Sequence, residues 1–156
     1  MKVFNSPLLF AEHLIKMAVK ESVALHEGLE KSVKLIEKSA KDEIGHLQPA
    51  VGNYNAWAEL TDVTKADKEA KGYVFNEDYN PLYRTGGLQD SISHEVGELE
   101  AVTGSTSELM PFFEYGTSKM PPRPVIGPAA FKNREKIKSI IGLAAFGGIA
   151  GIKTDV

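Results

Sequence analysis

A single helical stripe constrains this chain more than any other feature of its sequence. Small or apolar residues recur at steps of three or four, with Lys and Glu at most positions between them, which predicts one long amphipathic helix. Ser6-Pro7 is a favourable start, because Ser can cap a free amide and Pro loses no needed donor, and Gly45 is a natural stop. The stripe consists of Ala11, Ile15, Ala18, Ser22, Leu25, Leu29, Val33, Ile36, Ala40 and Ile44.

The length of this helix limits how it can be covered. About 39 residues span roughly 58 Å, about twice the diameter of a small domain. A chain of 156 residues is expected to form a single domain, residues 1–156, with one modest core. Part of the stripe therefore needs an outside partner. Gly28 leaves an alternative open, because it can kink the helix or split it in two.

The remaining sequence predicts an α+β fold: long N-terminal helix, extended arm, short helix, small antiparallel β-sheet and C-terminal helix. The arm is expected at residues 46–80, which mix Pro, Gly, Asn and aromatics and show no sustained period beyond a short helix at Thr64–Lys71. Connections of this length without structure of their own tend to be functional or disordered.

A short helix and a hairpin are expected after the arm. Thr85 can cap a helix that begins near Gly86. Gly97-Glu98 favours a type II′ turn, since Gly stands in the first central position. The strands are therefore expected near Ile92–Val96 and Leu99–Gly104.

The C-terminal third predicts two more helical segments. Ser107 to Tyr115 favours a short helix that contains a proline, or an irregular strand, and a longer helix is expected from Pro128 to about Ala145. A Gly-rich tail is expected at 147–156. The apolar run Ile140–Ile152 is shorter than the roughly 20 residues that span a bilayer, which favours a buried helix end or docking into a partner.

The charge balance excludes some partners. The net charge of −3 does not indicate a general attraction to nucleic acid, and the absence of cysteine excludes disulfides and thiolate metal sites. Residues 47–127 carry six cations and twelve acids, whereas residues 128–156 carry five cations and two acids. Head-to-tail pairing between subunits would use such an imbalance, although it also arises by chance.

No motif for catalysis is found. The four histidines belong to no HExxH or similar cluster, and GxSxG, GxGxxG and P-loop patterns are absent. We therefore expect no enzymatic activity, no cofactor and no metal. A basic face on the last helix offers the alternative of a structural protein that contacts nucleic acid, although a solvated face is the simpler interpretation. That face consists of Lys132, Arg134, Lys136 and Lys138.

Two segments, PLYRTGGLQDSI and FFEYGTSKMPPRPVIGPA, carry a resemblance to a known family. They resemble the phage virion morphogenesis or tail-completion family, which extends to head–tail joining proteins of long-tailed phages. The matching positions are Pro81, Leu82, Thr85, Gly86, Leu88, Ser91 and Ile92, then Gly116, Thr117, Met120, Pro121, Arg123 and Pro124, with Trp57, Leu60, Thr64 and Lys68 in the arm. The chain departs from the family pattern at Val125 and in its Gly-rich C-terminus.

This resemblance implies a structural protein without catalysis that forms a ring, commonly sixfold, at the top of the tail or at the neck. Its partners would be copies of itself and other tail or head-connector proteins, with DNA only passing through the ring lumen. Neither a small-molecule substrate nor a membrane is expected. The protein would reside in the virion, and in the host cytoplasm before assembly.

The proline-rich stretch is expected to be a preformed contact loop, because fixed φ angles reduce the ordering entropy lost on docking. Met120 would supply an adaptable apolar tip and Arg123 a planar fork for a neighbour's carboxylate. The alternative is a rigid connector packed against its own subunit. Trp57 is expected in an arm that is partly mobile until assembly. The interface candidates are Trp57, Arg84, Tyr115, Gly116, Thr117, Met120, Pro121, Arg123 and Pro124.

Overall fold

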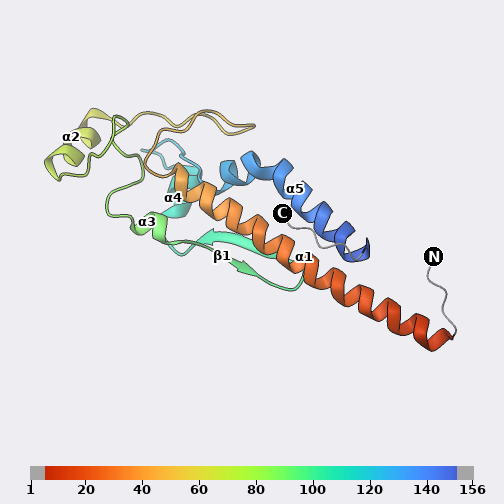
Figure 1. Cartoon of the computed structure of the whole chain (residues 1–156). Coiled ribbons are helices and arrows are strands. Elements are labelled where there is room, and N and C mark those ends of the chain that lie inside the picture. Colours follow the sequence, from red (N-terminus) through yellow and green to blue (C-terminus); the bar gives the residue numbers. More distant parts are fainter. Residues whose placement is uncertain (1–5, 151–156) are drawn as a thin grey trace.

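The computed structural model describes residues 6–150 and has the expected α+β architecture (Figure 1). A long helix is followed by an arm, a short helix, two antiparallel strands and a C-terminal helix, so the expected order of elements is confirmed. The elements are α1 (Pro7–Glu43), α2 (Asp62–Ala70), α3 (Gly87–Asp90), β1 (Ile92–Val96), β2 (Ala101–Ser105), α4 (Met110–Tyr115) and α5 (Ile126–Ala150).

Helix α1 is one unbroken helix of 37 residues. The Ser6 hydroxyl accepts a hydrogen bond from the Leu9 amide at 3.2 Å, so the predicted cap is confirmed. Gly28 does not split the helix. A Cβ atom there would lie 2.9 Å from the Cβ of Ala144, which shows that glycine allows α1 and α5 to approach closely.

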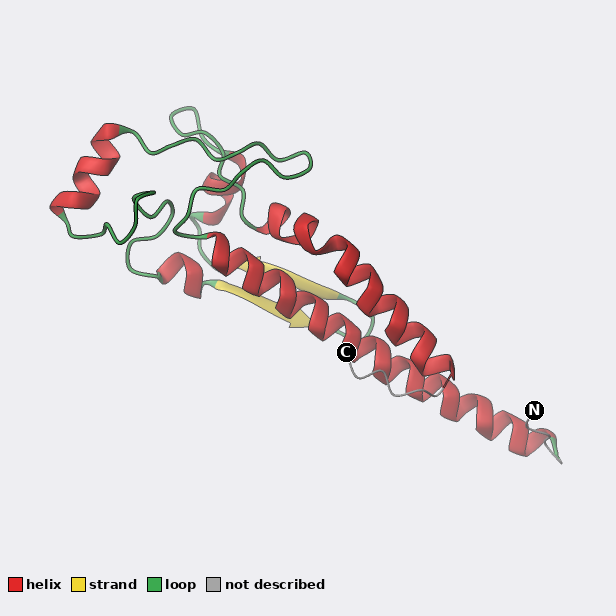
Figure 2. Ribbon diagram, turned by 45° about the horizontal axis from the view of Figure 1, so that its top comes forward, coloured by secondary structure: helices red, strands yellow, loops and turns green. Residues whose placement is uncertain are grey.

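Helices α1 and α5 lie side by side and antiparallel, with the hairpin packed along α1 (Figure 2). The contact extends from the Gly28–Ala144 crossing to the C-terminal end of α1, where Lys132 Nζ donates to Glu43 Oε1 at 2.8 Å. Burial raises the pKa of the Glu43 carboxyl above its usual value, while the hydrogen bond from Lys132 opposes that shift.

The hairpin is present, but its turn lies one residue later than expected. Val96 pairs with Ala101, and the Gly97 amide donates to the Glu100 carbonyl at 2.8 Å, so the turn is centred on Glu98 and Leu99. The prediction of a turn centred on Gly97-Glu98 is therefore wrong, and Gly97 does not adopt a positive φ. The contact with α1 fixes this register, because a one-residue slip would turn every side chain to the other face.

The expected capping of the short helix by Thr85 is also wrong. Gly86, with φ of 87°, precedes α3 as its N-cap, and no side chain caps that helix. A left-handed backbone at this point suits glycine, so the sharp turn rather than a hydroxyl starts the helix.

Helix α5 begins at Ile126, two residues earlier than expected. The Glu114 carboxylate accepts hydrogen bonds from the amides of Val125 and Ile126 at 2.9 and 2.7 Å, and this long-range cap explains the earlier start. The helix continues to Ala150, so the first part of the expected Gly-rich tail is helical, while residues 151–156 lie outside the described part. Over residues 6–150, no helix has both the length and the hydropathy needed to cross a bilayer.

The first part of the arm belongs to the core. Trp57 is 6% exposed, and its Nε1–H donates to the Pro124 carbonyl at 3.0 Å. The expectation of a mobile arm around Trp57 is therefore wrong, because burial of a large aromatic side chain offsets the entropy of ordering the chain. The residues buried together with Trp57 are Ala40, Ile44, Ile92, Met110, Val125 and Ala129.

Trp57 is the only tryptophan, so the emission spectrum reports its surroundings directly. We expect a blue-shifted emission from the folded protein at every concentration, and a red shift only on unfolding. Trp57→Phe should lower the free energy of unfolding by about 1–2 kcal/mol, because the Pro124 carbonyl loses its donor. A red-shifted emission from the folded dilute protein would contradict the buried position.

Candidate functional site

A cavity of about 850 Å³ brings together the two segments that carry the family resemblance. Its lining comes from the arm at 58–64 with Lys68, from the segment at 82–88, from Leu109 and Phe113, and from residues 119–123. We call this space the motif cavity. Four of the interface candidates line it, namely Arg84, Met120, Pro121 and Arg123.

The other candidates lie elsewhere. Trp57 is in the core, and Tyr115 is 84% exposed on the opposite side of the proline-rich stretch. Gly116 has φ of 73°, and a Cβ there would lie 2.8 Å from the Met120 carbonyl oxygen, so the position requires glycine. The Thr117 amide donates to the Met120 carbonyl at 2.8 Å, which makes this part of the loop a tight turn.

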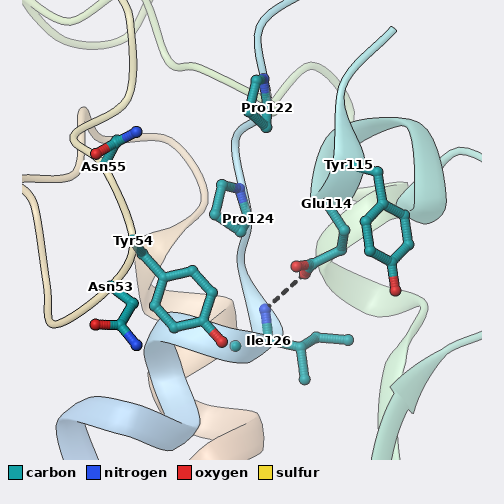
Figure 3. A pocket seen from close by; sticks show the side chains of 9 residues that line it. Asn53, Tyr54, Asn55, Glu114, Tyr115, Pro122, Pro124 and Ile126 are labelled. Carbon is teal, nitrogen blue, oxygen red and sulfur yellow. Dashed lines mark hydrogen bonds between the residues drawn. The ribbon is translucent and has the colours of Figure 1, made fainter.

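Tyr115 and Pro124 line a second cavity, of about 560 Å³, together with Tyr54 and Glu114 (Figure 3). Glu114 points towards the start of α5, where its carboxylate accepts from the Ile126 amide. The carboxylate of this cavity therefore serves as a helix cap.

Arg123 is buried, and two of its three guanidinium nitrogens donate hydrogen bonds within its own subunit. Its Nε and Nη2 donate to the Ala58 carbonyl at 3.2 and 2.8 Å, and Nη2 also donates to the Glu59 carbonyl at 3.1 Å. Burial lowers the pKa of the guanidinium. The interpretation of Arg123 as a fork for a neighbour's carboxylate is therefore corrected: Arg123 and the buried Pro124 connect the loop to the arm, while Met120 and Pro121 remain accessible.

Lys68 has a role that the sequence did not reveal. It is 3% exposed, and its Nζ donates to the carbonyls of Tyr79 and Tyr83 at 2.9 and 2.8 Å and to that of Asn80. Burial, and to a lesser degree the charge of Arg84, lowers its pKa to about 8. The Lys68 amine is thus largely protonated at neutral pH. Its ammonium group has three N–H donors, and the three carbonyls accept them.

The backbone that Lys68 holds is strained. Tyr79, Asn80 and Leu82 have φ angles of 57°, 50° and 61°, and left-handed backbone in residues other than glycine costs about 1–3 kcal/mol each. This backbone directs three carbonyls at one ammonium group, whose hydrogen bonds offset the strain. The sequence marks Lys68 only as a position of the family resemblance and does not predict its burial, because a lysine among the charged residues of α2 is typical of a solvated surface.

The motif cavity combines apolar walls with a positive rim. Arg84 is exposed and pairs with Asp67 at 3.1 Å, while the exposed Lys119 forms no ion pair within the described chain. Among the described residues, Glu59 is the only acidic side chain that lines the cavity. The apolar walls are formed by Leu60, Leu82, Leu88, Leu109, Phe113 and Met120. Such a space suits an apolar side chain with acidic neighbours.

The basic face of α5 is largely neutralised. Lys132 donates to Glu43 and Gln48, and both Arg134 and Lys138 contact Glu135 at 3.1 Å. Within residues 6–150, Lys136 is the one cation of this face without an ion pair. No group of three or more His, Asp or Glu side chains within residues 6–150 is arranged to hold a metal ion.

Comparison of the chain with known proteins gave no matching family model, no matching characterised protein and no matching solved structure.

Replacement of Lys68 tests its part in shaping the cavity wall. Lys68→Met should lower the free energy of unfolding by about 3 kcal/mol, because three buried carbonyls lose their donor. Lys71→Met is the matched control, since Lys71 is the C-cap residue of α2 and its side chain forms only a partly exposed pair with Asp67. Urea denaturation measures both, and equal losses would contradict the role of Lys68.

Replacement of Arg123 tests the connection between loop and arm. Arg123→Ala should lower the free energy of unfolding by about 3 kcal/mol, and Arg123→Lys should restore only part of it, because an ammonium lacks the planar fork. Arg84→Ala should cost less than about 1 kcal/mol, since its ion pair is exposed. A stability unchanged by Arg123→Ala would show that Arg123 does not act as the connector.

Proposed function

We propose that this chain is a structural protein of phage virion assembly, which acts in tail completion or head–tail joining as a ring of identical copies. Catalysis has no part in this role. The resemblance of two segments to the tail-completion family supports the proposal, as does their convergence on one cavity. The proposed partners are copies of this chain and neighbouring tail or head-connector proteins, in the virion and, before assembly, in the host cytoplasm.

The observation that carries the proposal is the N-terminal part of α1, which projects beyond α5 and the hairpin (Figures 1 and 2). Seven large apolar side chains of this part are between 47% and 69% exposed. We call them the projecting face: Leu8, Leu9, Phe10, Leu14, Ile15, Val19 and Val23. So many exposed large apolar side chains within residues 8–23 of one helix are typical of a protein–protein interaction site.

Burial of this face would contribute a large part of the free energy needed for association. Full burial of one large apolar side chain contributes about 1.5–3 kcal/mol, so covering the exposed half of seven contributes on the order of 5–10 kcal/mol. The loss of translational and rotational freedom costs about 4–15 kcal/mol. The face can therefore supply much of the energy of a subunit contact, and a second contact would complete it.

The shape of the subunit is consistent with a ring. The projecting face lies at one end of an elongated molecule, and α2, α3 and the arm lie at the other (Figure 1). A contact between two different surfaces is heterologous, and it gives a closed ring when the rotation between copies closes. The sixfold order commonly associated with the family is part of the proposal.

Self-association tests the proposed function. We expect light scattering to show oligomers at tens of micromolar, and negative-stain images to show rings. The double substitution Leu14→Glu and Ile15→Glu should shift the protein to monomers without loss of helix content, because charges would then replace exposed apolar groups. Val63→Glu on α2, where Val63 is 82% exposed, is the control. A monomeric unmodified chain under these conditions would refute the proposal.

A further inference from the structure

The tip of the β1–β2 hairpin carries an exposed leucine among acidic residues. Leu99 is 75% exposed, and Glu95, Glu98 and Glu100 around it are exposed as well. None of the three carboxylates forms an ion pair with any residue that the structure describes. Leu99 therefore contributes little to the fold of its own subunit, and its side chain is accessible to another molecule.

The tip is held in place before any contact is made. The Gly97 amide donates to the Glu100 carbonyl at 2.8 Å, which closes the turn. The Gly97 carbonyl accepts from His26 Nδ1–H at 3.0 Å, which attaches the turn to α1. Because the backbone is already ordered, docking of the tip costs little conformational entropy.

The motif cavity is complementary to this tip in both polarity and charge. Its apolar walls can accept the Leu99 side chain, and its volume lies within the range of about 300–1,000 Å³ usual for binding pockets. On its rim, Lys119 lacks a carboxylate partner among the described residues, and the exposed Arg84 pairs with the partly exposed Asp67. The tip presents three carboxylates and no cation.

The two features cannot meet within one subunit. The motif cavity includes residues of α3, immediately before β1, whereas the tip follows the far end of β1. Five residues of strand separate them by about 17 Å. Figure 1 shows α3 and the hairpin turn at opposite ends of the strands.

We propose that the hairpin tip of one copy docks into the motif cavity of the next copy, with Leu99 against the apolar walls and the tip carboxylates facing Lys119 and Arg84. This inference rests on the proposed assembly of identical copies. The contact is heterologous, so each copy gives one tip and accepts one, as a ring requires. The projecting face of a second copy suits the cavity less well, because residues 7–23 carry two Lys and two Glu and hence no net charge to match the positive rim.

Cross-linking tests the contact directly, because the chain contains no cysteine. The double variant Leu99→Cys, Met120→Cys should give a ladder of disulfide-linked oligomers under mild oxidation. A mixture of the two single variants should give a 99–120 cross-link as its main product, identified by mass spectrometry. If 99–99 links dominate, or if Met120→Cys links to Ile15→Cys instead, the tip does not occupy the cavity and the proposal is overturned.

Substitutions on the tip and in the cavity test the contact a second time, with self-association of the 156-residue chain as the measurement. Leu99→Ser should weaken self-association about tenfold or more, as expected for loss of a buried leucine, whereas Val102→Ser, at an exposed apolar position of β2, should leave it unchanged. Lys119→Glu and Glu98→Lys should each weaken association, and a mixture of the two variants should recover part of it.

The results separate this inference from the proposed function. If the unmodified chain forms rings, yet Leu99→Ser assembles normally and no 99–120 link forms, the tip contact is refuted and the assembly role stands. If the unmodified chain is monomeric by light scattering, the assembly role is refuted and the tip contact with it.

Discussion

The irregular half of this molecule depends on side chains that satisfy backbone carbonyls. Outside the helices and strands, buried carbonyls have no ladder partner, and each needs a donor from elsewhere. The Trp57 indole N–H donates to the Pro124 carbonyl. The Arg123 guanidinium donates to the carbonyls of Ala58 and Glu59. The Lys68 ammonium donates to three carbonyls of the strained segment at 79–83. These three long side chains give the arm, the 81–88 segment and the proline-rich stretch one fixed arrangement.

The shape of the motif cavity follows from the same interactions. Lys68 and Arg123 line it, but both side chains are buried and donate to backbone carbonyls, so they form part of its walls. The accessible charge lies on the rim, at Arg84 and Lys119. A partner's side chain that enters this cavity therefore meets apolar walls, with accessible cations at the rim. This arrangement favours an apolar side chain with acidic neighbours.

The regular elements could be predicted from the sequence because their signals are local. The stripe and caps of α1 and the alternation of the hairpin depend on neighbouring residues. The predictions that failed needed partners far along the chain: Glu114 starts α5 early, α1 sets the hairpin turn, and Trp57 is buried. Lys68 and Arg123 were missed as buried groups for the same reason. The sequence thus located the two segments that form the candidate site, but it did not predict the roles of individual residues within them.

In the proposed ring, the contact of the projecting face contributes most of the stability, and the contact of the hairpin tip selects the orientation of the subunits. The projecting face is apolar and bears balanced charge, so its burial stabilises association but selects poorly among orientations. The hairpin tip is small and acidic, and the rim that faces it is positive, so this contact selects the orientation and loses strength in salt. Copies with a net charge of −3 repel one another weakly at long range, which disfavours approaches that do not bring the acidic tip to the positive rim. An apolar contact that holds subunits together and a charged contact that directs them head to tail would favour a closed ring over a disordered aggregate.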